Sequence, residues 1–285
     1  MYRSCSELLE LTKGGAPIWR VVLDNEMALS GLSEEEVLSR LRTRWEIMKV
    51  SATRALTSPL PTALGLITGI TAPQYSYCAG GGLCGELINR VMAYALSCSE
   101  SNAAMGKICA APTAGSCGII PAVMMGLKEK LSLSDDDVLK GMLTASGIGA
   151  IVTRNATLSG AEGGCQAECG TAAAMAAAAA VELSGGTPEQ ALDAASFTLM
   201  NCMGLVCDPV AGLVQLPCAQ RNASQAVNAL LSADLALAGM KCPIGADEVI
   251  ASMYSVGKSL PHTLRETALG GIAASDSAKK IAKGL

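Results

Sequence analysis

The order of polar and apolar residues along the chain is typical of helices separated by loops, and it lacks a convincing run of the alternation that marks a β-strand. Several helix starts carry capping signals. Ser33 precedes Glu36 by three residues, Ser134 precedes three aspartates, and Thr187 is followed by Pro188. We expect helices at residues 4–13, 33–56, 86–97, 119–131, 134–151 and 166–183, one beginning at Pro188, and two more beginning near residues 219 and 247.

These elements predict a single all-α domain over residues 1–285, since no linker and no internal repeat divides the chain. A short strand at 21–23 and an irregular polar tail at about 272–285 are the expected exceptions. Three loops, at 110–118, 155–164 and 202–218, each lead into a helix. Because helix N-termini present free N–H groups and partial positive charge, these loops are suitable places for thiolates and carboxylates.

Composition narrows the class of protein. Half of the residues are hydrophobic, 16% are charged and 3% are aromatic, so the core must be built from small and aliphatic side chains. The net charge is −4 and no basic stripe appears, which argues against nucleic acid as a partner. The longest apolar run, 172–181, is half of the roughly twenty residues that a membrane span needs. With no apolar segment typical of a secretion signal near Met1, we expect a cytoplasmic protein.

The chain has twelve cysteines, an unusual number for such a protein. Most can be buried packing residues. Cys165, Cys207 and Cys218 differ because each lies in a loop or at a helix start, where thiolates are stabilised. Three thiolates suit a 4Fe–4S cluster with one iron left open, although their spacing alone does not distinguish ligation from packing.

Four segments carry a family resemblance. The stretches 111–122, 155–166, 207–222 and 264–271 resemble the alpha subunit of the iron–sulfur-dependent L-serine dehydratases, and the likeness covers most of the chain. It implies that Cys165, Cys207 and Cys218 hold a 4Fe–4S cluster. It also implies that the open iron acts as a Lewis acid on the β-hydroxyl of L-serine, which yields pyruvate and ammonium.

The resemblance also implies a partner. Single-chain members of the family carry a second domain with a Ser-Ser-His-Thr-type motif, and some end in a cysteine that blocks the open iron. Neither feature occurs in this sequence, which ends in Lys283-Gly284-Leu285. We therefore expect a separate beta subunit. The one histidine of this chain, His262, suits a structural role better than that of the base that removes the α-proton, so a residue of the beta subunit is a candidate for this base.

The remaining candidates are polar residues of the loops. Glu162 is the expected local carboxylate for proton transfer, with helix capping as its structural alternative. Arg265 can bind a substrate carboxylate through two hydrogen bonds or form a structural ion pair. The other candidates for substrate binding, each of which can instead cap a helix or complete a turn, are Thr113, Ser116, Asn155 and Ser159.

Three other functions remain open on the sequence. The run Gly80-Gly81-Gly82 suits a phosphate, as in pyridoxal-phosphate-dependent dehydratases, but the strands and Schiff-base lysine segment of that class are missing. A cysteine desulfidase with the same cluster chemistry differs only in the leaving group. A non-catalytic zinc or cluster protein requires a fourth ligand, for which Cys169, four residues after Cys165, is a candidate.

Overall fold

The chain folds into α-helices joined by loops and short helical turns, which confirms the expected all-α class. The computed structural model describes residues 2–284. Within them the one β contact is an isolated parallel bridge between Cys207 and Arg265. The helices are α1 (Cys5–Thr12), α2 (Ile18–Ser30), α3 (Glu34–Thr53), α4 (Thr71–Cys78), α5 (Gly85–Ala103), α6 (Ile119–Leu131), α7 (Asp135–Asn155), α8 (Gly160–Gly163), α9 (Thr171–Leu183), α10 (Pro188–Cys202), α11 (Cys218–Leu237), α12 (Ala246–Ser259) and α13 (Asp276–Ala282).

The capping residues act as predicted. Ser33, Ser134 and Thr187 are the N-caps of α3, α7 and α10, and each accepts a hydrogen bond from the backbone N–H three residues later. In each case the side chain of that later residue accepts in return from the N-cap backbone, which completes a capping box. The starts of these three helices were therefore readable from local sequence.

The predicted strand at 21–23 is wrong, because these residues lie inside α2. Pro17, which precedes α2, makes no side-chain cap. The cap comes instead from Glu182 at the end of α9, whose carboxylate accepts from the backbone N–H of Ile18 at 2.6 Å and also from that of Trp19. A cap supplied from so far along the chain leaves no local signal in the sequence. The polar tail also contains a helix, α13.

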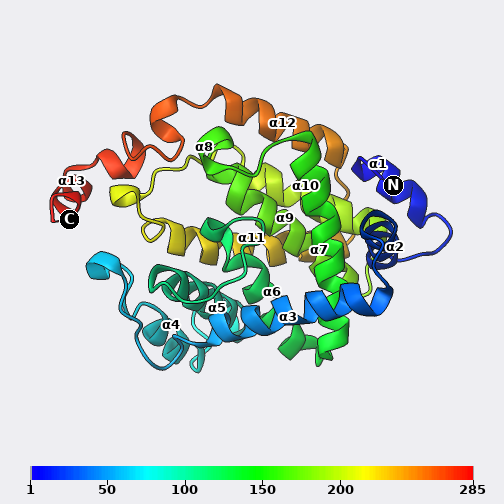
Figure 1. The fold of residues 1–285 in the computed structure, drawn as a ribbon, viewed down its shortest axis with the longest axis horizontal. Helices are drawn as coiled ribbons and strands as arrows, with labels where there is room; N and C mark the ends of the chain where they lie inside the picture. The colour runs from blue at the N-terminus through cyan, green and yellow to red at the C-terminus, as the bar shows by residue number, and fades with distance from the viewer. Residues whose placement is uncertain (1, 285) are drawn as a thin grey trace.

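The alanine-rich helix α9 forms the centre of the fold (Figure 1), and every residue from Thr171 to Val181 is buried. It packs against α6, α7, α10 and α11. Because alanine side chains are short, four helices can approach α9 closely without aromatic residues in the contacts. The expected helix at 166–183 begins with a π-helical turn, η3 (Gln166–Gly170), which places this rigid helix directly after Cys165.

The two ends of the chain lie at opposite ends of the molecule, with α12 along one edge and α3 along the other (Figure 1). No helix in the described part of the chain combines the length and the apolar character that crossing a bilayer requires.

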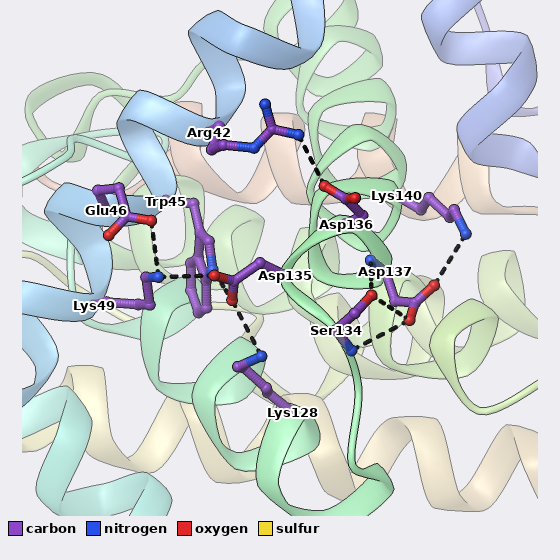
Figure 2. Close-up of polar contacts among 10 residues, drawn as sticks. All are labelled: Arg42, Trp45, Glu46, Lys49, Lys128, Ser134, Asp135, Asp136, Asp137 and Lys140. Atoms are coloured by element: carbon purple, nitrogen blue, oxygen red, sulfur yellow. Dashed lines mark hydrogen bonds and ion pairs between the residues drawn. The ribbon is translucent and has the colours of Figure 1, made fainter.

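A polar network joins α3 to the start of α7 (Figure 2). The carboxylate of Asp135 accepts from the indole N–H of the buried Trp45 at 2.9 Å and from Lys49 at 2.9 Å, and it pairs with Lys128 at 3.1 Å. The next residue, Asp136, pairs with Arg42 at 2.8 Å. Acidic residues in the first turn also suit the helix dipole, so the network fixes both the start of α7 and its packing.

This network predicts acid sensitivity. The hydrogen bonds from Trp45 and Lys49 lower the pKa of Asp135 below its usual 3.8, and those from Ser134 and Lys140 lower the pKa of Asp137 to about 2. A depressed carboxyl pKa stabilises the fold at pH values above the unfolded pKa, and this contribution is lost as pH falls from about 4 to about 2. We expect Asp135→Asn to flatten the fall in the free energy of unfolding over this pH range. Urea titrations of both proteins between pH 5 and pH 2 measure it, and equal slopes contradict the assignment.

Candidate functional site

Cys165 lies between α8 and the π-helical turn η3, and it is 3% exposed. Its neighbour Gln166 is fully buried and fixes the segment from both sides. The Gln166 amide donates to the carbonyls of Gly163 at 2.9 Å and Met253 at 3.0 Å, and its side-chain oxygen accepts from Gly204 N–H at 2.8 Å. A π-helical turn is common at functional sites, and here it sets the position of the Cys165 thiol.

Cys207 reaches the same region from the loop after α10. It is 4% exposed, and its backbone pairs with the segment that follows α12. The Cys207 N–H donates to Leu264 carbonyl at 2.9 Å, and the Glu266 N–H donates to the Cys207 carbonyl at 2.6 Å. Gly160 lies against the sulfur: a side-chain carbon added at Gly160 would lie 3.0 Å from the Cys207 Sγ. The glycine therefore keeps the space beside this thiol open.

Cys218 is the first residue of α11, so its thiol lies at a helix N-terminus, as the sequence predicted. The turn before it is held by Gln215, which is 2% exposed and donates its side-chain amide to the Ala63 carbonyl at 2.7 Å. The Gln215 carbonyl accepts from the Ala219 N–H at 2.8 Å, inside the first turn of α11. The start of α11 is thus tied to the distant segment around residue 63.

The three thiols lie close enough to influence one another's ionisation. Burial raises the pKa of Cys218 to about 12, and the negative charge of Cys165 contributes to the rise. Burial and the charge of Cys165 also raise the pKa of Cys207 above its usual 9. Since each thiolate disfavours the next, ionisation of all three requires a cationic partner. The segments that carry the three cysteines pack together: Arg221 of α11 contacts the residues on either side of Cys207, and α11 also packs against η3.

Cys169 and Glu168 complete this cluster of side chains. The sulfurs of Cys165 and Cys169 lie 3.2 Å apart, and a carboxylate oxygen of Glu168 lies within 4.8 Å of both. The sulfur contact lowers the pKa of Cys165 and, together with burial, raises that of Cys169.

Glu168 was missed in the sequence because it falls inside an expected helix. It is half-buried, and Thr113 Oγ1 donates a hydrogen bond to it. A side-chain carbon at Gly115 would lie 2.5 Å from its carboxylate oxygen, so the loop closes tightly over the acid. Burial raises the pKa of Glu168 above 4.5, against the hydrogen bond from Thr113. The one sequence signal for a site role of Glu168 is its position, three residues after Cys165 and next to Cys169.

The loop at 110–118 is held by its own polar residues. Ser116 is fully buried and contacts the Thr113 hydroxyl at 3.2 Å. Asn222 of α11 accepts from the Gly118 N–H at 2.9 Å and donates to the Gly115 carbonyl at 2.6 Å. Of the two predicted substrate-binding residues here, Thr113 contacts Glu168 beside the thiols, whereas Ser116 completes the turn.

The other predicted residues lie at the ends of α7 and α8. Asn155 is the exposed last residue of α7, and its amide donates to the carbonyls of Arg3 and Ile151. Glu162 is exposed and accepts from Thr157 at 2.6 Å, outside the group of Cys165, Glu168 and Cys169. Ser159 is half-buried directly before α8 and makes no side-chain cap there.

Arg265 lies beside Cys207 through the parallel bridge. Its Nε is buried without a hydrogen-bond partner, and Arg265 forms no ion pair with any residue in the range 2–284. Buried donors are nearly always paired in folded proteins, so this guanidinium is a candidate for an external acceptor. His262, by contrast, is exposed.

The residues present fit an iron–sulfur cluster. Such clusters are held by cysteine thiolates, and the segments that carry two buried thiols and one half-buried thiol pack together here, with a glycine beside the Cys207 sulfur. Their mutual repulsion as thiolates is relieved by a cationic metal, which removes the protons of its thiol ligands. A soft, thiol-rich donor set of this kind selects iron–sulfur groups or zinc over hard cations such as Mg²⁺.

Comparison with known proteins gives a consistent result. The family model described as "Serine dehydratase alpha chain" matches residues 13–273. The L-serine dehydratase alpha chain of Peptoniphilus asaccharolyticus is 48% identical over 283 residues, which cover 99% of this chain and 97% of that one. A probable L-serine dehydratase alpha chain of Bacillus subtilis is 42% identical, with 99% and 95% covered.

Longer relatives match over part of their length. L-serine dehydratase 1 of Escherichia coli is 37% identical over 280 residues, which cover 95% of this chain and 61% of that protein. The chain thus spans about three fifths of this longer relative, whereas it matches the two alpha chains above almost from end to end.

Proposed function

Since this chain belongs to the serine dehydratase alpha chain family, we propose that it catalyses the dehydration of L-serine to pyruvate and ammonium with a 4Fe–4S cluster. The observation that carries the proposal is that the segments bearing Cys165, Cys207 and Cys218, far apart in sequence, pack together, with Cys165 and Cys207 buried and Cys218 half-buried.

The three thiolates would hold three irons of the cluster and leave the fourth without a protein ligand. When bound, such a cluster supplies a Lewis acid that makes the β-hydroxyl of serine a better leaving group. Gly160 keeps space beside Cys207, and the tight π-helical turn fixes Cys165. We leave Cys169 outside the ligand set, which the family resemblance assigns to Cys165, Cys207 and Cys218.

Two further side chains would act on the amino acid. Arg265, with its unpaired buried Nε beside Cys207, would bind the substrate carboxylate. Glu168 would accept the proton from Cα, because it is the carboxylate within 4.8 Å of the Cys165 sulfur and burial has raised its pKa. Loss of the α-proton and of hydroxide gives an enamine, which tautomerises and hydrolyses to pyruvate and ammonium.

A separate beta chain would complete the enzyme. The chain matches proteins named alpha chains almost completely but covers 61% of the single-chain relative from Escherichia coli. Exposed Leu64, Leu269 and Ile272 belong to segments that contact the cysteine-bearing loops, so they are candidates for the contact with that chain.

Anaerobic reconstitution tests the proposed function. The chain is incubated with ferrous iron and sulfide, with and without the beta chain from the same source, and pyruvate release is measured with L-serine and L-cysteine. We expect pyruvate from L-serine that requires the cluster. Full activity in protein free of iron and sulfide contradicts the proposal, and faster turnover of L-cysteine than of L-serine assigns the chain to desulfidation instead.

The role of Arg265 gives a separate prediction. Arg265→Gln removes a charged donor to the substrate carboxylate, which is typically worth about 1.5–3 kcal/mol, so we expect KM for L-serine to rise about 10- to 100-fold. Arg40→Gln, on the exposed face of α3, should leave KM unchanged. Steady-state kinetics of the reconstituted variants measure both values. An unchanged KM in Arg265→Gln assigns carboxylate binding to another residue.

A further inference from the structure

Arg221 connects two of the cysteine-bearing segments. It lies in the first turn of α11, three residues after Cys218. One guanidinium nitrogen donates to the Val206 carbonyl at 2.8 Å, and the other pairs with the Asp208 carboxylate at 2.8 Å. A single side chain from the helix of Cys218 therefore holds the residues on both sides of Cys207.

Asp208 extends this connection to the C-terminal segment. Its side chain is 5% exposed, and besides pairing with Arg221 it accepts from the Ile272 N–H at 2.6 Å. Gly271 allows this approach, because its φ is +57° and a side-chain carbon there would lie 2.1 Å from the Asp208 oxygen. Arg221 and Asp208 thus join α11, the Cys207 loop and the segment after α12 at one point.

The charge of Arg221 lies near the same thiols, since Arg221 is in the first turn of α11 with Cys218 and contacts both residues that flank Cys207. Burial alone would lower its pKa, but the negative charges of Cys165, Asp208 and Cys218 outweigh this effect and raise it. The side chain is 17% exposed, so water screens these interactions only weakly. Of these three anions, the buried Asp208 pairs directly with the guanidinium, and the other two are the thiolates of Cys165 and Cys218.

We propose that Arg221 is a positioning residue, which fixes the spacing between Cys207 and Cys218 and balances the negative charge of the thiolates. The role rests on the proposed function, since it concerns how these cysteines hold their iron–sulfur group. Without the guanidinium, the Cys207 loop keeps its backbone pairing with 264–266 but loses its connection to the helix that carries Cys218. Removing a partner that orients metal ligands typically costs about 10- to 100-fold in affinity.

The test compares anaerobically reconstituted wild type with Arg221→Lys, Arg221→Gln and the exposed control Arg40→Gln. Iron and acid-labile sulfide are counted, and the rate of iron transfer to a ferrous chelator is followed. We expect transfer about 10-fold faster in Arg221→Gln, an intermediate rate in Arg221→Lys, and a wild-type rate in the control. The cluster reduction potential should become more negative in Arg221→Gln and return toward wild type in Arg221→Lys, which a purely structural role would not produce.

Asp208→Asn covers the case in which Arg221→Gln fails to fold. It keeps an acceptor for the Ile272 N–H but removes the charge that holds Arg221, so it should also release iron faster. Equal iron-release rates and reduction potentials in wild type and the folded variants contradict the proposed role of Arg221 but leave the proposed function intact. A wild-type chain that takes up no iron or sulfide contradicts the proposed function, and this role with it.

Discussion

Replacement of Cys165, Cys207 or Cys218 by serine should each reduce pyruvate release from L-serine by more than about 100-fold. Residues that merely orient metal ligands are typically worth about 10- to 100-fold, so loss of a ligand must cost more. Serine is nearly isosteric, and the three sites are buried or half-buried, which limits the structural disturbance. Activity, iron content and sulfide content of the anaerobically reconstituted variants measure the effect.

Cys169→Ser is the matched variant for this series. Cys169 is also buried and contacts Cys165 at 3.2 Å, but we place it outside the ligand set. We expect it to keep its cluster and most of its activity. If instead Cys169→Ser is inactive and Cys207→Ser or Cys218→Ser stays active, the site is built from Cys165, Glu168 and Cys169, and the proposed ligand set is wrong.

Glu168→Gln should lower kcat by about 10²- to 10⁴-fold, the usual effect of removing a positioned proton acceptor. The amide still accepts a hydrogen bond from Thr113, so the loop over it should stay closed while the ability to take a proton is lost. Cluster content should match wild type. Steady-state kinetics with L-serine and with L-serine deuterated at Cα measure the loss, and the isotope effect on kcat should increase in the variant.

The comparison with Glu162→Gln decides between two carboxylates. Glu162 was the candidate from sequence, but it is exposed and bonded to Thr157. We expect Glu162→Gln to keep kcat within a few-fold of wild type. An inactive Glu162→Gln beside an active Glu168→Gln would restore the hypothesis drawn from the sequence, and two active variants would place the base on the beta chain.

Most of the fold could be predicted because its signals are local. Ser33, Ser134 and Thr187 mark helix starts through hydrogen bonds that span three residues, and the apolar stretch 172–181 belongs to the central helix. The strand expected at 21–23 failed for the opposite reason. The N-terminus of α2 is capped by Glu182, a contact between residues more than 160 positions apart.

In the candidate site, too, residues with a local sequence signal could be predicted and residues that depend on distant contacts could not. Loop positions pointed to Cys165, Cys207 and Cys218, whose segments pack together in the structure, and their role as ligands stays a prediction. Glu168 could not be distinguished from an ordinary helical glutamate, because its burial depends on the loop around Gly115. The polar residues of that loop were equally ambiguous, because a hydroxyl such as that of Ser116 can either complete a turn or face a ligand. Ser116 is buried in the structure and contacts Thr113, so it completes the turn.

The most direct test of the central claim is a Mössbauer spectrum of the chain reconstituted with ⁵⁷Fe, recorded with and without L-serine. We predict a 4Fe–4S cluster in which one iron of the four differs from the other three, and only the signal of that iron shifts when the substrate is added. Protein that binds no cluster, or four equivalent irons that L-serine leaves unchanged, would contradict it.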